Sequence, residues 1–113
     1  MKILDEPMTV EALRGIASDT FGDLVKAVVD VRRGLVAIDA ELHSDLEALL
    51  IDDGSRQSDL WGINYYPDLE GNDFIEFDSM INMRPSQGNA SRGVDDEGLR
   101  MKIIEITAEW ILR

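Results

Sequence analysis

The sequence predicts an α+β fold in two layers, with a mainly antiparallel sheet built from two hairpins and about three helices. β-Branched and aromatic residues concentrate in residues 24–38 and 60–82, and a turn signal interrupts each stretch. Apolar residues recur at helical spacing in residues 9–20, 44–54 and 95–112. The order is a short strand, a helix, a hairpin, a helix, a hairpin and a helix. We therefore expect helices packed on one face of the sheet.

The first elements are predicted from local signals. Residues 1–4 resemble a short strand, and Pro7 prevents regular structure until a helix can begin. Thr9 is a good N-cap, and Met8 stands where the first residue of a hydrophobic staple would lie. Gly22 is expected to end this helix.

A hairpin that turns near Gly34 is expected in residues 24–38. The alternative is one long bent strand, because two consecutive arginines before this glycine are a weak turn signal. Ser44 and Glu47 have the spacing of a capping box, and Gly54 is a suitable end for the helix that would follow.

Residues 60–66 form an aromatic-rich segment that predicts a strand, and residues 74–82 predict its hairpin partner across a loop at 67–73. Asp95 or Asp96 is expected to cap the last helix. Its apolar stripe is Leu99, Ile103, Ile106 and Trp110.

Composition indicates one domain that covers residues 1–113, of a soluble and cytoplasmic protein. The chain has 23 acidic and 11 basic residues and a formal net charge of -12, which argues against nucleic-acid binding. It has no cysteine, which excludes disulfides and thiolate chemistry. No apolar run approaches the roughly 20 residues that span a bilayer, and no secretory signal is expected at the N-terminus.

The polar loop at residues 82–93 is the first candidate for a binding site. Residues 79–94 contain no carboxylate, although the chain as a whole is strongly acidic. We predict that this loop binds a small anionic ligand, because guanidinium and amide groups suit carboxylates and phosphates. The predicted ligand-binding residues are Arg84, Gln87, Asn89 and Arg92. The alternative is that the two arginines pair with carboxylates of the chain and hold the loop in place.

His43 and Asp78 are the candidates for catalysis. His43 is the only histidine, and it could act as a base if it meets Asp78 or Glu76 across the fold. The alternatives are that His43 has a structural or surface role and that Glu76 and Asp78 lie on a solvent-exposed face of the sheet. No metal site is predicted, because the acids at i+2 and i+4 from His43 cannot share one helical face with it. Motifs for nucleotides, zinc proteases or nucleophilic serines are absent, so no cofactor is predicted.

Two functions remain open at this point. The first is a binding or interaction module that forms a homodimer, since the aromatic hairpin at residues 60–77 has two faces that three short helices cannot both cover. The second is an enzyme that acts on a small anionic substrate through the 82–93 loop. Convergence of His43, Asp78 and Arg84 in one pocket would favour the enzyme.

Three runs of the sequence resemble a known family. They are ELHSDLEALL at residues 41–50, GSRQSDLWGIN at 54–64, and the long run from Asp73 to Val94. Together they are similar to a family of small, uncharacterised prokaryotic proteins classed as a domain of unknown function. The resemblance implies a single domain of about this length, and it implies no activity, substrate or catalytic residue.

Overall fold

The computed structural model describes all residues from Met1 to Arg113. Its centre is a five-stranded antiparallel sheet of order β1-β4-β3-β5-β6. These strands are β1 (Lys2–Ile3), β3 (Val25–Asp30), β4 (Leu35–Ile38), β5 (Leu60–Tyr65) and β6 (Ile75–Glu76). Strands β2 (Met8–Thr9) and β7 (Ile111–Leu112) form a separate parallel pair. The predicted α+β class and the mainly antiparallel sheet are confirmed.

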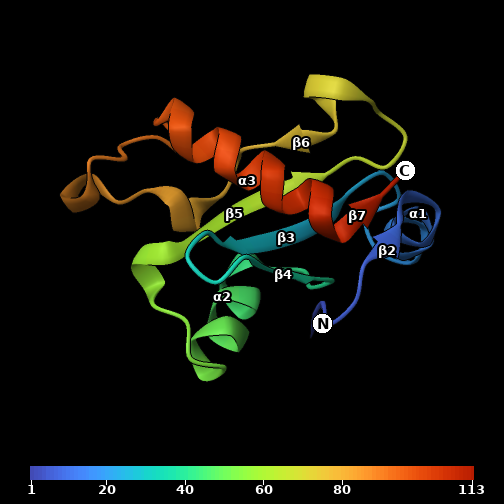
Figure 1. Ribbon diagram of the computed structural model, residues 1–113, viewed down its shortest axis with the longest axis horizontal. Helices are drawn as coiled ribbons and strands as arrows, with labels where there is room; N and C mark the ends of the chain where they lie inside the picture. The colour runs from blue at the N-terminus through green and yellow to red at the C-terminus, as the bar shows by residue number, and fades with distance from the viewer.

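Three helices cover the sheet, namely α1 (Val10–Asp19), α2 (His43–Asp52) and α3 (Glu97–Trp110). Figure 1 shows α3 and α2 on opposite faces. Successive residues of β3 agree with this, because Val28 packs with Leu46 of α2 whereas Val29 belongs to the larger core with Ile103 of α3. The expectation that the helices share one face was therefore wrong, because the central strands are apolar on both faces.

The helix-start signals succeeded at α1 and α3 and failed at α2. Thr9 accepts a hydrogen bond from the Ala12 amide at 3.1 Å, and Asp96 accepts one from Leu99 at 2.8 Å. In α2 the N-cap is Leu42, and no side chain caps the first turn. The predicted capping box that begins at Ser44 is therefore wrong. The hydroxyl of that serine caps no backbone N–H group.

The predicted strand at residues 74–82 is much shorter in the structure. Pairing with β5 ends at Glu76, and Met80–Asn82 form a 3-10 turn. The Asn82 side chain takes the place of the missing strand, since it accepts from Gly62 N at 2.8 Å and donates to Gly62 O at 2.9 Å. One amide side chain thus satisfies both backbone groups of Gly62 at this edge of β5.

The aromatic residues of the predicted second hairpin are mostly covered within the chain. Trp61, Tyr65 and Phe74 are buried, and the Tyr65 and Phe74 rings stack at 5.4 Å between centroids. Cover on both faces of the sheet accounts for this burial and removes the argument that pointed to a dimer. The oligomeric state stays a prediction. None of the helices is long and apolar enough to cross a membrane.

Candidate functional site

A small polar cavity lies at the beginning of α2, on the face of the sheet that this helix covers. We call it the His43 cavity, and its volume is about 190 Å³. Its lining residues come from strands β3 and β5, the beginning of α2, the segment after β6, and Arg92. Its polar lining consists of Lys26, His43, Ser44, Asn64, Asp78, Ser79 and Arg92. Three residues singled out from the sequence, His43, Asp78 and Arg92, therefore meet at one place.

Gly62 gives the segment after β6 its close approach to the sheet. A Cβ atom at this position would lie 2.6 Å from both Cβ and Oγ of Ser79 and 3.2 Å from Cδ2 of His43. Only a glycine lets these two side chains pack directly on the strand backbone. Ser79 and His43 are thereby held side by side at the floor of the cavity, and both are buried.

The His43 ring has a defined protonation and orientation. Its Nε2 lies 2.7 Å from the carbonyl oxygen of Ile63. Because a carbonyl only accepts, Nε2 carries the proton, and Nδ1 of the neutral ring keeps a lone pair with no hydrogen-bond partner in the chain. Burial lowers the pKa of His43, and the nearby Lys26 lowers it further, against the opposing effects of the Ile63 carbonyl, Asp78 and the Asn64 side chain. The ring is therefore neutral at pH 7.

The first turn of α2 adds hydrogen-bond donors to the cavity. The first N–H groups of an α-helix have no partner within the helix, and the N-cap residue Leu42 offers no side-chain oxygen to them. His43 and Ser44 occupy the first two helical positions, and both line the cavity. This end of the helix also carries the positive end of its dipole.

Two cationic side chains border the cavity. Lys26 Nζ lies 5.5 Å from the centroid of the Phe21 ring and takes part in no ion pair of the chain. Arg92 donates from Nε to Asp78 at 2.7 Å, and its two terminal nitrogens make no hydrogen bond within the chain. Since Asp78 balances Arg92, the cavity carries one net positive charge on a chain whose net charge is -12.

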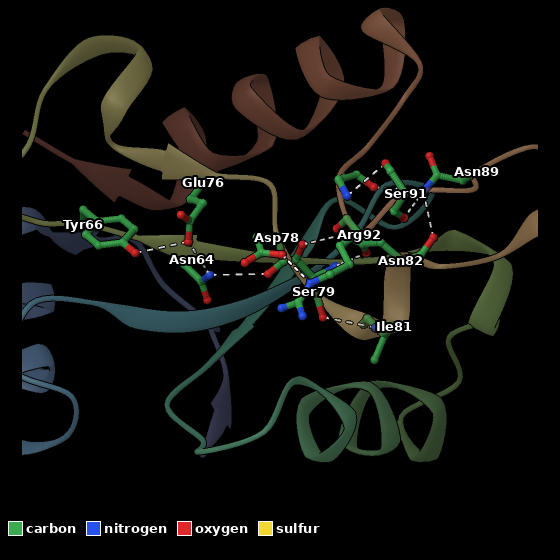
Figure 2. A network of polar contacts seen from close by, with 12 residues as sticks. Asn64, Tyr66, Glu76, Asp78, Ser79, Ile81, Asn82, Asn89, Ser91 and Arg92 are labelled. Atoms are coloured by element: carbon green, nitrogen blue, oxygen red, sulfur yellow. Dashed lines mark hydrogen bonds and ion pairs between the residues drawn. The ribbon is translucent and has the colours of Figure 1, made fainter.

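Asn64 leaves one buried polar atom without a partner. Its Nδ2 donates to Glu76 Oε1 at 2.8 Å, as Figure 2 shows, and Glu76 also accepts from the Tyr66 hydroxyl at 3.1 Å. The Asn64 Oδ1 atom is buried and receives no hydrogen bond. A donor that reached this atom would remove a desolvation cost that the fold otherwise bears.

The other predicted binding residues lie elsewhere and have different partners. Arg84 is buried, stacks 4.6 Å from the Trp61 ring centroid, and donates to the carbonyls of Ile81 and Leu60. Glu47 lies 3.6 Å from it and opposes the effect of burial, which lowers the pKa of Arg84. This geometry matches the alternative raised from the sequence, in which Arg84 holds the loop in place.

Asn89 and Gln87, the other two predicted binding residues of the loop, do not line the His43 cavity. Asn89 is buried and donates to the carbonyls of Asn82 and Gly93 at 2.7 and 2.9 Å, and it accepts from Asp95 N at 2.8 Å. Gln87 is exposed, and its side chain makes one hydrogen bond, a long one of 3.4 Å to the Ser58 carbonyl. The loop therefore contributes Arg92 alone to the His43 cavity. No group of three or more His, Cys, Asp or Glu is placed to hold a metal ion.

Sequence reasoning missed Lys26, Ser44, Asn64 and Ser79 as lining residues. A signal for two of them was present, because Lys26 and Asn64 are polar residues in the middle of largely apolar central strands. They are also direct partners across β3 and β5, which places both on the α2 face of the sheet. Ser79 and Gly62 are distant in the sequence, so no local sequence pattern could predict their contact.

The lowered pKa of His43 predicts how stability responds to acid. Between its usual pKa of about 6.5 and its folded value, the unfolded chain binds a proton that the folded chain resists. The free energy of unfolding should therefore fall as the pH drops through 6.5, by at most about 1.4 kcal/mol per pH unit. Urea unfolding at several pH values between about 7.5 and 5.5 measures this slope.

The matched variant for this test is His43→Gln, whose Nε2 can still donate to the Ile63 carbonyl. Comparison of the two proteins removes the contribution of the many carboxylates, which both share. We expect the parent to lose stability relative to the variant over this pH range. Parallel pH profiles would show that His43 titrates alike in the folded and unfolded chains.

Comparison with known proteins agrees with the resemblance seen in the sequence. No curated protein and no solved structure matches the chain. A family model does match, and it covers residues 2–110, which is nearly the whole length. The chain therefore belongs to the family described as "Protein of unknown function (DUF5674)".

Proposed function

We propose that this protein binds a small anionic molecule in the His43 cavity. The observation that carries the proposal is the convergence of Lys26, Arg92 and the uncapped start of α2 on one cavity. Charged and backbone N–H donors that face one space are the usual means of holding a carboxylate or phosphate. The strongly negative remainder of the surface would still repel long polyanions.

Two further features support a ligand in this cavity rather than a solvated surface hollow. Asn64 is more than nine-tenths buried, and its Oδ1 is a buried atom with no hydrogen-bond partner. Nδ1 of the neighbouring His43 ring also accepts no hydrogen bond from the chain. Buried polar atoms are rarely left unpaired in native proteins. A ligand with a hydrogen-bond donor beside its anionic group would complement these acceptors.

An NMR titration of isotope-labelled protein tests the proposal directly. Acetate and inorganic phosphate are added separately, and the amide signals of Lys26, His43 and Ser44 are followed. We expect saturable shifts at these amides in the parent. The shifts should weaken at least tenfold in apparent affinity in Lys26→Gln and in Arg92→Gln, since each loses a cation that faces the bound anion.

The matched control is Lys102→Gln, which removes an exposed lysine of α3 and changes the net charge by the same amount. It should bind like the parent, because the bound anion contacts no side chain of α3. Equal weakening in all three variants would indicate a general charge effect, and the absence of saturable shifts in the parent would end the proposal.

An enzyme that acts on a small anionic substrate is the second candidate. The neutral His43 ring, with Nδ1 available and Asp78 lining the same cavity, favours it. Against it, Arg84 lies outside the cavity, and the Ser79 hydroxyl is buried and accepts from Ile81 N at 3.3 Å. Binding without chemistry is therefore the function that this geometry supports best. Self-association, which the sequence also predicted, can no longer be argued from exposed aromatic residues, because Trp61, Tyr65 and Phe74 are buried within the chain.

A further inference from the structure

The rim of the His43 cavity differs in chemistry from its interior. Leu42 and Met80 stand at the rim and are 55% and 63% exposed, and the partly buried Ile81 lies beside them. Single exposed apolar side chains are common on protein surfaces, but these three lie together beside the opening of one polar cavity. Their position at the rim means that any molecule protruding from the cavity would pass over them.

The size of the cavity requires such a protrusion for most ligands. Its volume of about 190 Å³ is below the roughly 300–1,000 Å³ of typical small-molecule sites. It can hold a compact charged group and few further atoms. A nucleotide or a sugar phosphate would place its polar remainder on the apolar rim, where its hydrogen-bonding groups would find no partners.

The charges around the cavity favour a single negative charge. Lys26 and Arg92 supply two positive charges, Asp78 cancels one of them, and the neutral His43 adds none. A monoanion would therefore be balanced, whereas a dianion would keep one uncompensated charge in a strongly acidic protein.

From these three observations we infer that the ligand is a monocarboxylate with an apolar substituent of a few carbon atoms. The carboxylate lies between Lys26, Arg92 and the first turn of α2, and the substituent covers Leu42, Met80 and Ile81. This inference rests on the proposed function, because it names the ligand class of the same cavity.

The same NMR titration, extended to a ligand series, tests the inference. The probes are 4-methylpentanoate, acetate, and the uncharged 4-methylpentanamide. Each fully buried methylene strengthens binding about fourfold. Because the rim covers only part of the substituent, we expect the dissociation constant of 4-methylpentanoate to be roughly tenfold below that of acetate. The amide should bind at least tenfold more weakly than 4-methylpentanoate.

Variants of the rim separate the substituent from the charged group. Leu42→Ala and Met80→Ala should reduce the advantage of 4-methylpentanoate over acetate severalfold. The exposure of both side chains makes these changes compatible with folding, and Met101→Ala, on α3 at 53% exposure, is the matched control. Alanine is chosen at Leu42 because serine there would cap α2 and occupy the N–H groups in question.

The outcomes distinguish the two proposals. If acetate binds at the cavity but 4-methylpentanoate binds no more tightly, the inference is wrong and the proposed function stands. Tighter binding that the rim variants leave unchanged would equally overturn the inference. If no probe shifts the amides of the cavity, both the inference and the proposed function fail.

Discussion

Replacing Asn82 by alanine is expected to lower the free energy of unfolding by roughly 3 to 5 kcal/mol, a large share of the stability of a domain of this size. The Asn82 side chain is fully buried and bonds both backbone groups of Gly62 and, at 2.9 Å, the carbonyl of Arg92. Alanine leaves both backbone groups of Gly62 without partners in a buried place, and the Arg92 carbonyl keeps only its bond from Ser79 N. Each buried unsatisfied group costs about 1–3 kcal/mol, and partial relaxation reduces the sum.

Urea unfolding of the parent and the Asn82→Ala variant measures this loss. Asn72→Ala is the control, because Asn72 is exposed and its side chain makes no hydrogen bond in the chain. We expect that control to stay within about 0.5 kcal/mol of the parent. A loss below about 1 kcal/mol in Asn82→Ala would mean that the segment after β6 does not depend on this side chain.

The contrast between residues 24–38 and residues 74–82 explains how far the sequence predicted the fold. The first hairpin follows from alternating apolar residues and a glycine turn, and β3 and β4 occur as expected. In the second region the apolar pattern of Phe74, Ile75 and Phe77 also predicted a strand, but pairing ends at Glu76. What replaces the strand is the single side chain of Asn82, and strand propensity contains no information about such a substitute.

Only some of the residues that line the His43 cavity were singled out from the sequence, because residue type does not show which backbone groups the fold leaves unpaired. His43, Asp78 and Arg92 were identified as polar or charged residues with useful chemistry, and they do line one cavity. Arg84 and Asn89 have the same kinds of side chain but hold the loop by bonds to backbone carbonyls. Residue type alone cannot separate these roles, because both depend on which backbone groups the fold leaves unpaired nearby.

The second large effect is expected at Gly62, where an alanine should destabilise the protein by about 3 kcal/mol and distort the His43 cavity. The added Cβ would lie 2.6 Å from the Cβ and Oγ atoms of Ser79, a separation that packed atoms do not tolerate. Overpacking of a buried site costs about 1–3 kcal/mol, and the backbone near Ser79 is fixed by its hydrogen bond to the Arg92 carbonyl at 2.9 Å. The effect should therefore lie at the upper end of that range.

A matched glycine and a second substitution test the cause of this effect. Gly15 lies in α1, where an added Cβ atom would meet no other atom within 4 Å, so Gly15→Ala should stabilise the protein by roughly 0.5–1 kcal/mol. In the Gly62→Ala background, Ser79→Gly should recover part of the lost stability because it removes the clashing Cβ. Ser79→Ala keeps that atom and should recover much less, and a double-mutant cycle in urea measures both couplings. Equal recovery by the two changes would show that the hydroxyl, and not the close backbone approach, makes glycine necessary at this position.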